Sequence, residues 1–317
     1  MNLLHEYKKQ YRAVIISPHF DDAVFSCGGL INQLVKEGPV LIYTIFTDYL
    51  SGIKIHGVVL SETRQQEEID AAHFLGFESR SIGELDAVVR RKTYQKLGNI
   101  FRPPIHADTV WLPTLRTKIF KELAQLEFKE LYVPLGVGWH VDHILTYQLF
   151  EPWFDHTSIV FYEDIFYSCI PNSVRYRLHE IALYTHDVSD QSLTKSTMII
   201  SWWETSRYYM GTTLMKNLKP WILRVCAVPV VSFYFFRLIS FHRKQSMITS
   251  KRHFVPHHVP LSSDTLNRKV DAMMLYKSQF KEFFSSREEC VRMLTEYAHR
   301  IDTTGGACER YWKITKN

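Results

Sequence analysis

Two short polar clusters contain the side chains of this 317-residue chain that are best suited to chemistry. The first is His19-Phe20-Asp21-Asp22, and the second is His140-Val141-Asp142-His143. Each cluster places potential ligands three positions apart, which is about one turn if a helix begins there. Two imidazoles and one carboxylate around an open coordination position form a catalytic zinc site or a related divalent-metal site. A neighbouring carboxylate that does not bind the metal can then serve as a base.

Each cluster also has a purely structural explanation. A lone His-x-x-His pair lies more often on a surface or in a core than at a metal. Asp21 or Asp22 could simply cap the helix that follows. Both clusters, however, come directly after a predicted strand. Two such clusters in equivalent places favour a functional site over two unrelated caps.

The pattern of apolar residues predicts alternating strands and helices in the first half of the chain. Short apolar runs predict strands at residues 12–17, 40–46, 130–134 and 158–162. Periodic apolar positions predict helices at residues 23–36, 61–75, 115–127 and 144–150. This alternation is typical of an α/β fold with a mostly parallel sheet. Ligands of such sheets bind beyond the carboxyl ends of the strands, where both clusters lie.

The two clusters resemble the motifs of the PIG-L/LmbE-like family of zinc-dependent N-deacetylases. Ser17-Pro18-His19-Phe20-Asp21-Asp22 is similar to the family's PHPDD motif, and Gly138-Trp139-His140-Val141-Asp142-His143 is similar to its HxDH motif. Residues 85–87, 162–164, 276–279 and 305–312, with Arg90 and Tyr167, resemble segments of one subgroup. The resemblance implies a Rossmann-like, LmbE-like sheet flanked by helices, with a C-terminal elaboration.

The resemblance implies a role for each polar residue around the expected metal. His19, Asp22 and His143 would bind Zn²⁺ or another divalent metal. Asp21 would be the general base that deprotonates the attacking water. These roles agree with the chemistry of the groups, because zinc polarises an amide carbonyl and lowers the pKa of its water to about 7.

The remaining candidates would bind substrate or complete the reaction. The resemblance implies that His140 stabilises the oxyanion and protonates the leaving amine, while Asp142 orients its ring. It also implies a substrate-binding role for Arg64, although such an arginine is often an ion-pair partner. Glu163 and Asp164 follow a predicted strand, so they either bind substrate hydroxyls or an amine, or form an ordinary acidic pair in a loop.

One position departs from the family pattern. The PHPDD motif usually continues with Glu, whereas this chain has Ala23. Because that Glu is not a metal ligand, the expected donor set is unchanged. Support for the site must then come from elsewhere, and Ser26 or the backbone is the expected source.

Composition and charge narrow the class of protein. With 46% hydrophobic and 22% charged residues, the chain is neither a disordered nor a fibrous protein. A net charge of +5 is too small to indicate nucleic acid as a partner by itself. Five scattered cysteines and a polar N-terminal segment without a signal peptide indicate a reducing, cytoplasmic location, with membrane association left open.

Residues 190–261 have no counterpart in the family pattern. We expect them to be a basic and apolar insertion within a single domain that spans residues 1–317. Residues 202–252 contain nine Lys or Arg and one acidic residue, Glu204. The simplest interpretation is a buried segment with an electropositive rim. Weak peripheral contact with anionic lipid and an electropositive lid over an anionic substrate are the alternatives.

The expected function is therefore the hydrolytic removal of an N-acyl group. The acyl group is expected to be N-acetyl, and the substrate an amino sugar or a related small molecule. Hydrolysis of a different amide is one alternative. A non-catalytic or membrane-peripheral binding module that retains the deacetylase fold is another. A nucleotide-binding oxidoreductase is disfavoured because no glycine fingerprint follows the first strand.

Overall fold

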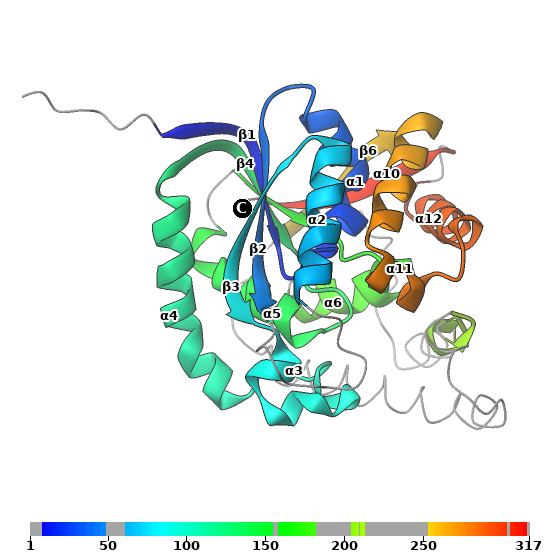
Figure 1. The fold of residues 1–317 in the computed structure, drawn as a ribbon. Coiled ribbons are helices and arrows are strands. Elements are labelled where there is room, and N and C mark those ends of the chain that lie inside the picture. Colours follow the sequence, from blue (N-terminus) through cyan, green and yellow to red (C-terminus); the bar gives the residue numbers. More distant parts are fainter. Residues whose placement is uncertain are drawn as a thin grey trace, which may run out of the picture.

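Seven strands form one sheet in the computed structural model, in the order β3-β2-β1-β4-β5-β7-β6 (Figure 1). The structure describes residues 8–48, 61–154, 158–181, 204–208, 210–212, 253–302 and 305–315. The strands are β1 (Lys9–Ser17), β2 (Val40–Asp48), β3 (Glu78–Leu85), β4 (Leu126–Pro134), β5 (Ile159–Tyr162), β6 (His253–Leu261) and β7 (Ala307–Thr315). The helices are α1 (Asp22–Leu34), α2 (Ser61–Leu75), α3 (Ala87–Arg90), α4 (His106–Leu123), α5 (Val141–Leu149), α6 (Ser173–Ile181), α10 (Ser263–Leu275), α11 (Lys277–Phe283) and α12 (Arg287–Ile301).

The sheet is parallel over its first five strands and antiparallel at one edge. β1 pairs in parallel with both β2 and β4, β2 pairs with β3, and β4 pairs with β5. β7 then pairs in antiparallel fashion with β5 on one side and β6 on the other. The prediction of a mostly parallel α/β sheet with a C-terminal elaboration is confirmed.

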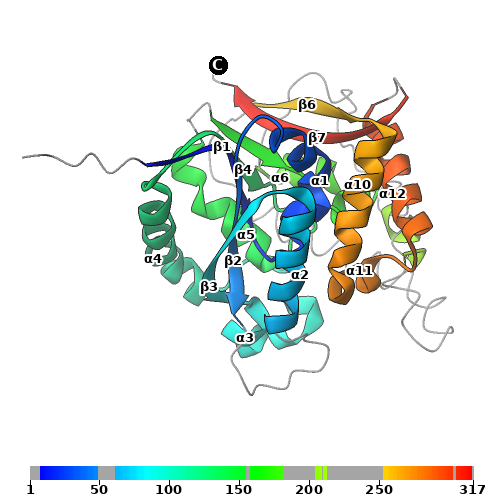
Figure 2. The same ribbon diagram turned by 45° about the horizontal axis from the view of Figure 1, so that its top comes forward.

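Helices cover both faces of the sheet, and each face has its own hydrophobic core. Ala13 and Ile15 of β1 pack in the core formed with α1, α2, α10 and α12. Val14 and Ile16 pack in the opposite core, formed with α4, α5 and α6. Figure 2 shows α1, α2 and α10 together on one side of the sheet and α4 on the other. β1 is therefore buried on both faces, which is why its sequence is a continuous apolar run.

The structure corrects the sequence-based boundaries in three places. β3 was not predicted, because it is a partly exposed edge strand without an apolar run. α4 begins at His106 rather than at residue 115, and Pro113 lies inside it. Residues 126 and 127, expected to end that helix, begin β4 instead.

The expected insertion at residues 190–261 overlaps the sheet. Its last nine residues form β6, an edge strand that contains two prolines, Pro256 and Pro260. Edge strands tolerate proline, and this composition hid the strand in the sequence. His257 and His258 lie in this strand.

The segment considered for membrane contact, residues 202–252, falls almost entirely outside the described residues. Within the described residues, every helix is too short or too polar to cross a membrane.

Candidate active site

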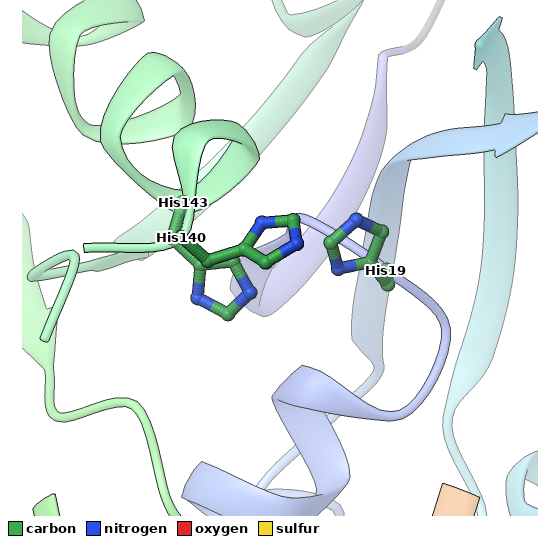
Figure 3. Close-up of side chains that lie close together, drawn as sticks. All are labelled: His19, His140 and His143. Atoms are coloured by element: carbon green, nitrogen blue, oxygen red, sulfur yellow. The ribbon is translucent and has the colours of Figure 1, made fainter. Parts of the chain in front are cut away.

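The two polar clusters meet at the carboxyl ends of neighbouring strands. The first lies in the turn between β1 and α1, and the second lies between β4 and the first turn of α5. Figure 3 shows the imidazole rings of His19, His140 and His143 side by side. Their ring centroids are 5.1 to 5.4 Å apart. The hydroxyl of Ser17 donates to the carbonyl of His19 and accepts from the N–H of Ala23, which shapes the turn that presents His19.

His19, Asp22 and His143 form the donor set that was predicted for a metal. Oδ2 of Asp22 lies 3.0 Å from Nδ1 of His19 and 3.2 Å from Nε2 of His143. All three side chains are nearly buried. Although burial opposes ionisation, His143 and His19 keep the pKa of Asp22 well below its usual range. An ionised carboxylate between two imidazole nitrogens is a donor set that fits a divalent cation.

In His19 and His143 one ring nitrogen, here called inward, faces Asp22, and the other, called outward, points away from it. A carboxylate lies beside the outward nitrogen of each ring. Nδ1 of His143 is 2.6 Å from Oδ1 of Asp164, and Nε2 of His19 is 3.2 Å from Oδ2 of Asp142. Although burial opposes a charge on either ring, Asp142 and Asp22 raise the pKa of His19 to about 9, and Asp22 and Asp164 raise the pKa of His143. A cation bound at the inward nitrogens would take the place of their protons, while the outer carboxylates would keep the proton on each outward nitrogen.

Asp164 contacts other groups of the protein rather than the space for a substrate, although substrate binding was one role expected for it. Its Oδ2 accepts hydrogen bonds from the N–H groups of Gly136 and Val137, each at 2.8 Å. Its Oδ1 lies 2.6 Å from Nδ1 of His143. Asp164 is almost fully buried and does not line the cavity at the site. These contacts orient the imidazole of His143 and leave no surface of Asp164 for a substrate.

Glu163 likewise contacts other parts of the fold rather than the cavity. Its carboxylate accepts from the hydroxyl of Tyr297 at 2.7 Å, from Nε of Arg310 at 2.5 Å and from Nε1 of Trp312 at 2.7 Å. It is 2% exposed, so the expected contact with substrate does not fit its position. Glu163 joins β5 to α12 and β7.

Asp21, the predicted base, forms a buried ion pair with Arg64. Nη2 of Arg64 lies 2.8 Å from Oδ1 of Asp21. Burial and the charge of Asp22 raise the pKa of Asp21, and Arg64 opposes that increase. Both side chains also line the cavity, so Arg64 contacts the base and faces the space for substrate.

His140 and Asp142 differ from expectation in their contacts. The backbone N–H of Asp142, not its carboxylate, lies against Nδ1 of His140, at 3.3 Å. The carboxylate instead contacts His19 and Nη2 of Arg90, the latter at 2.6 Å. Burial, together with His19 and His143, lowers the pKa of His140 to about 3. His140 is therefore neutral, accepts at Nδ1 and carries its proton on Nε2.

Sequence reasoning did not place several residues that the structure brings to the site. Oδ2 of Asp86 lies 3.3 Å from Nε2 of His19. Arg90, which contacts Asp142, packs its guanidinium over the rings of Phe46 and Trp111. The cavity, about 130 Å³ in volume, is lined by His19, Asp21, Asp22, Arg64, Asp86, His140, His143, Ile165, Tyr167, Gln279 and Phe283. The sequence signals for these additions were the motif-like segments at residues 85–87 and 276–279, together with Arg90 and Tyr167.

Ala23, which replaces the usual Glu, is fully buried in the hydrophobic core beside α1. Ser26, the expected source of support, accepts from the N–H of Ile165 at 3.1 Å. It therefore supports the loop that carries Asp164 rather than a metal ligand directly.

Comparison with known proteins agrees with this geometry. Residues 14–154 match the sequence model of the PIG-L family, described as GlcNAc-PI de-N-acetylase. This match includes both polar clusters. Over these residues the chain is similar to the PIG-L family.

Individual relatives are deacetylases. The chain is 27% identical to 2'-N-acetylparomamine deacetylase of Streptomyces fradiae over 150 residues. The aligned region is 45% of this chain and 52% of that protein. The chain thus spans about half the length of this curated relative.

Solved structures share the fold over nearly the whole chain. A40926 pseudoaglycone deacetylase Dbv21 gives a TM-score of 0.60 at 16% identity, covering 96% of this chain and 97% of its own. The zinc-inhibited form of teicoplanin deacetylase Orf2 gives a TM-score of 0.61 at 16% identity, covering 96% and 98%. At these identities the similarity establishes an LmbE-like fold.

Proposed function

We propose that this protein is a metal-dependent N-deacetylase that acts on an N-acetylated amino sugar or a related small molecule. The observation that supports this most strongly is the convergence of Asp22 with the inward nitrogens of His19 and His143, next to the separate carboxylate of Asp21. Two relatives support the same substrate class by their names, which describe deacetylases of 2'-N-acetylparomamine and of the A40926 pseudoaglycone.

His19, Asp22 and His143 would hold the cation. A divalent cation supplies Lewis-acid polarisation of the amide carbonyl and of water at such a site. Zinc is the cation we propose, and the zinc-inhibited form of one structural relative is a reason to test other divalent metals beside it.

The residues around the ligands suit the proton transfers of amide hydrolysis. Asp21 accepts a proton from water as the water oxygen bonds to the carbonyl carbon, and Arg64 keeps that carboxylate in place. His140 donates a hydrogen bond from Nε2 to the carbonyl oxygen as negative charge develops there. When the C–N bond breaks, the proton on Asp21 passes to the departing amine. Burial, together with His19 and His143, lowers the pKa of His140, so we assign the proton of the departing amine to Asp21, where the sequence resemblance implies His140.

A reconstitution assay tests the proposal. Metal-depleted protein would be loaded separately with zinc, cobalt, manganese or nickel and incubated with N-acetylated sugars and aminoglycosides, with products followed by mass spectrometry. We expect metal-dependent loss of an acetyl group from at least one amino sugar. The binding-module alternative predicts metal binding, or none, without hydrolysis of any substrate under any metal.

Two variants separate the chemistry from metal binding. Asp21→Asn removes the proton acceptor and His140→Ala removes the oxyanion donor, and each should lower kcat by at least two orders of magnitude. Neither residue belongs to the donor set, so metal content measured by atomic emission should stay at the wild-type level. Retained turnover in Asp21→Asn would contradict the assignment of the base.

A further inference from the structure

One wall of the catalytic cavity comes from a part of the chain remote from both motifs. Gln279 and Phe283 of α11 line the cavity together with His19 and Asp21 of the β1–α1 turn. Figure 1 shows α11 below α10, on the side of the sheet that carries α2. One wall of the cavity therefore comes from the C-terminal elaboration, beyond the PIG-L match at residues 14–154.

α2 fixes the position of this wall relative to the catalytic base. Glu67 accepts from both the N–H and the hydroxyl of Ser278, at 2.8 and 2.6 Å. The next residue, Glu68, accepts from the hydroxyl of Tyr276 at 2.5 Å. One turn earlier on the same helix, Arg64 contacts Asp21. A single helix therefore sets both the base and the start of α11.

Phe283 is packed at the other end of α11. Its ring centroid lies 4.8 Å from that of Phe166 and 6.4 Å from that of Phe25. These aromatic contacts oppose rotation of the ring away from the cavity. Phe283 thus forms a fixed surface.

The cavity lining is divided by polarity. Ile165, Tyr167 and Phe283 are its apolar or aromatic members, and Phe166, which packs on Phe283, lies between the first two in the chain. The remaining members are polar or charged. A hydroxylated amino sugar matches the polar members, whereas the alkyl part of an acyl group matches only the apolar ones.

We propose that Phe283 limits the length of the acyl group that this site accepts. The inference rests on the proposed function and deepens it. A cavity of about 130 Å³ holds roughly four water molecules, far less than the 300–1,000 Å³ or so that encloses a drug-sized ligand. The space suits an acetyl group at the reacting centre, and a longer chain meets the ring of Phe283.

The test measures acyl-length preference in wild type, Phe283→Ala and Phe283→Leu. Substrates are glucosamines with N-acetyl, N-propionyl, N-butanoyl and N-hexanoyl groups. In wild type, kcat/KM should fall steeply beyond acetyl. In Phe283→Ala the butanoyl-to-acetyl ratio of kcat/KM should rise at least tenfold, with Phe283→Leu between the two. Lys281→Ala, an exposed change on the same helix, should leave the ratio at the wild-type value.

A binding series separates this proposal from the proposed function. Alkyl hydroxamates of one to five side-chain carbons would be titrated into metal-loaded protein by calorimetry. We expect affinity to fall with length in wild type and to recover in Phe283→Ala. If the length dependence of binding changes in this way but the protein hydrolyses no amide, the proposed deacetylase function is overturned and the role of Phe283 in limiting length stands. Hydrolysis with an unchanged length preference in both folded Phe283 variants would overturn the role and keep the function.

Discussion

Asp164 acts on the site through another residue. Its carboxylate accepts hydrogen bonds from two backbone N–H groups and lies against Nδ1 of His143. These contacts hold the carboxylate in place and orient the ring that faces Asp22. The motif identified His143, but the partner of its ring lies 21 positions later, beyond the next strand. Only the pairing of β4 with β5 brings the two together, and no local spacing in the sequence encodes that pairing.

Replacing Asp164 should weaken metal binding. In Asp164→Asn the side chain has a single acceptor oxygen. Its NH2 group must therefore point either at His143 or at the two backbone N–H donors. We expect a 10- to 100-fold loss of metal affinity, measured by competition with a chromogenic chelator. Asp70→Asn, on the exposed surface of α2, is the control and should bind metal as wild type does. Equal affinity in the two variants would show that Asp164 does not orient the ligand.

At the scale of elements, the turn before α5 is the most constrained part of the site. Gly138 has φ of +88°, and a Cβ there would lie 2.2 Å from Cγ of Tyr167. The rings of Tyr167 and His143 are in a T-shaped, edge-on contact, with centroids 6.2 Å apart. The close approach therefore connects the turn that presents His140 to a wall of the cavity.

A matched pair of glycine variants measures that constraint. Gly76 has φ of +89° but open space around a Cβ, so Gly76→Ala should cost only the backbone strain, about 1–2 kcal/mol. Gly138→Ala adds a clash with Tyr167, so it should cost clearly more and also lower kcat. Urea unfolding and steady-state kinetics check both effects. Similar losses of stability with unchanged kcat would argue against the connection.

The elements that could be predicted from sequence share one property, burial on both faces. β1, β2, β4 and β5 are continuous apolar runs because helices cover them on each side. β3 and β6 lie at the edges of the sheet. At an edge, a strand with few apolar residues, such as β3, or with two prolines, such as β6, can still pair with its neighbour. The two polar clusters that hold the proposed metal ligands and the proposed base were predictable because each cluster is local in the sequence. Asp86, Gln279 and Phe283 were not, since tertiary packing alone brings them there.

On the scale of the whole molecule, buried carboxylates make stability depend on pH. Glu68 joins α2 to the α10–α11 junction through Tyr276 and contacts Ser79 of β3. Burial raises the pKa of Glu68 from 4.5 to about 7, although both hydroxyls oppose the increase. Between these two values the folded protein binds more protons than the unfolded chain. The contribution of Glu68 to stability is therefore complete below about pH 4.5 and is lost as the pH rises through 7.

Glu68→Gln should remove this dependence. The amide keeps an acceptor for one hydroxyl and cannot ionise. The difference in unfolding free energy between wild type and variant should change by up to about 3 kcal/mol from pH 5 to 7.5, in the direction that favours the variant at high pH. Urea unfolding at several pH values measures it. Parallel stability curves for the two proteins would rule out a raised pKa at Glu68.

The place of β7 in the sheet has a consequence for how the protein matures. Residues 307–315 are inserted between β5 and β6, although they follow both in the chain. While the ribosome still holds that stretch, Glu163 lacks Arg310 and Trp312, two of its three donors. An ionised group without these partners resists burial. We therefore expect the neighbouring Asp164 and His143 to reach their final positions only once residues 307–315 have joined the sheet.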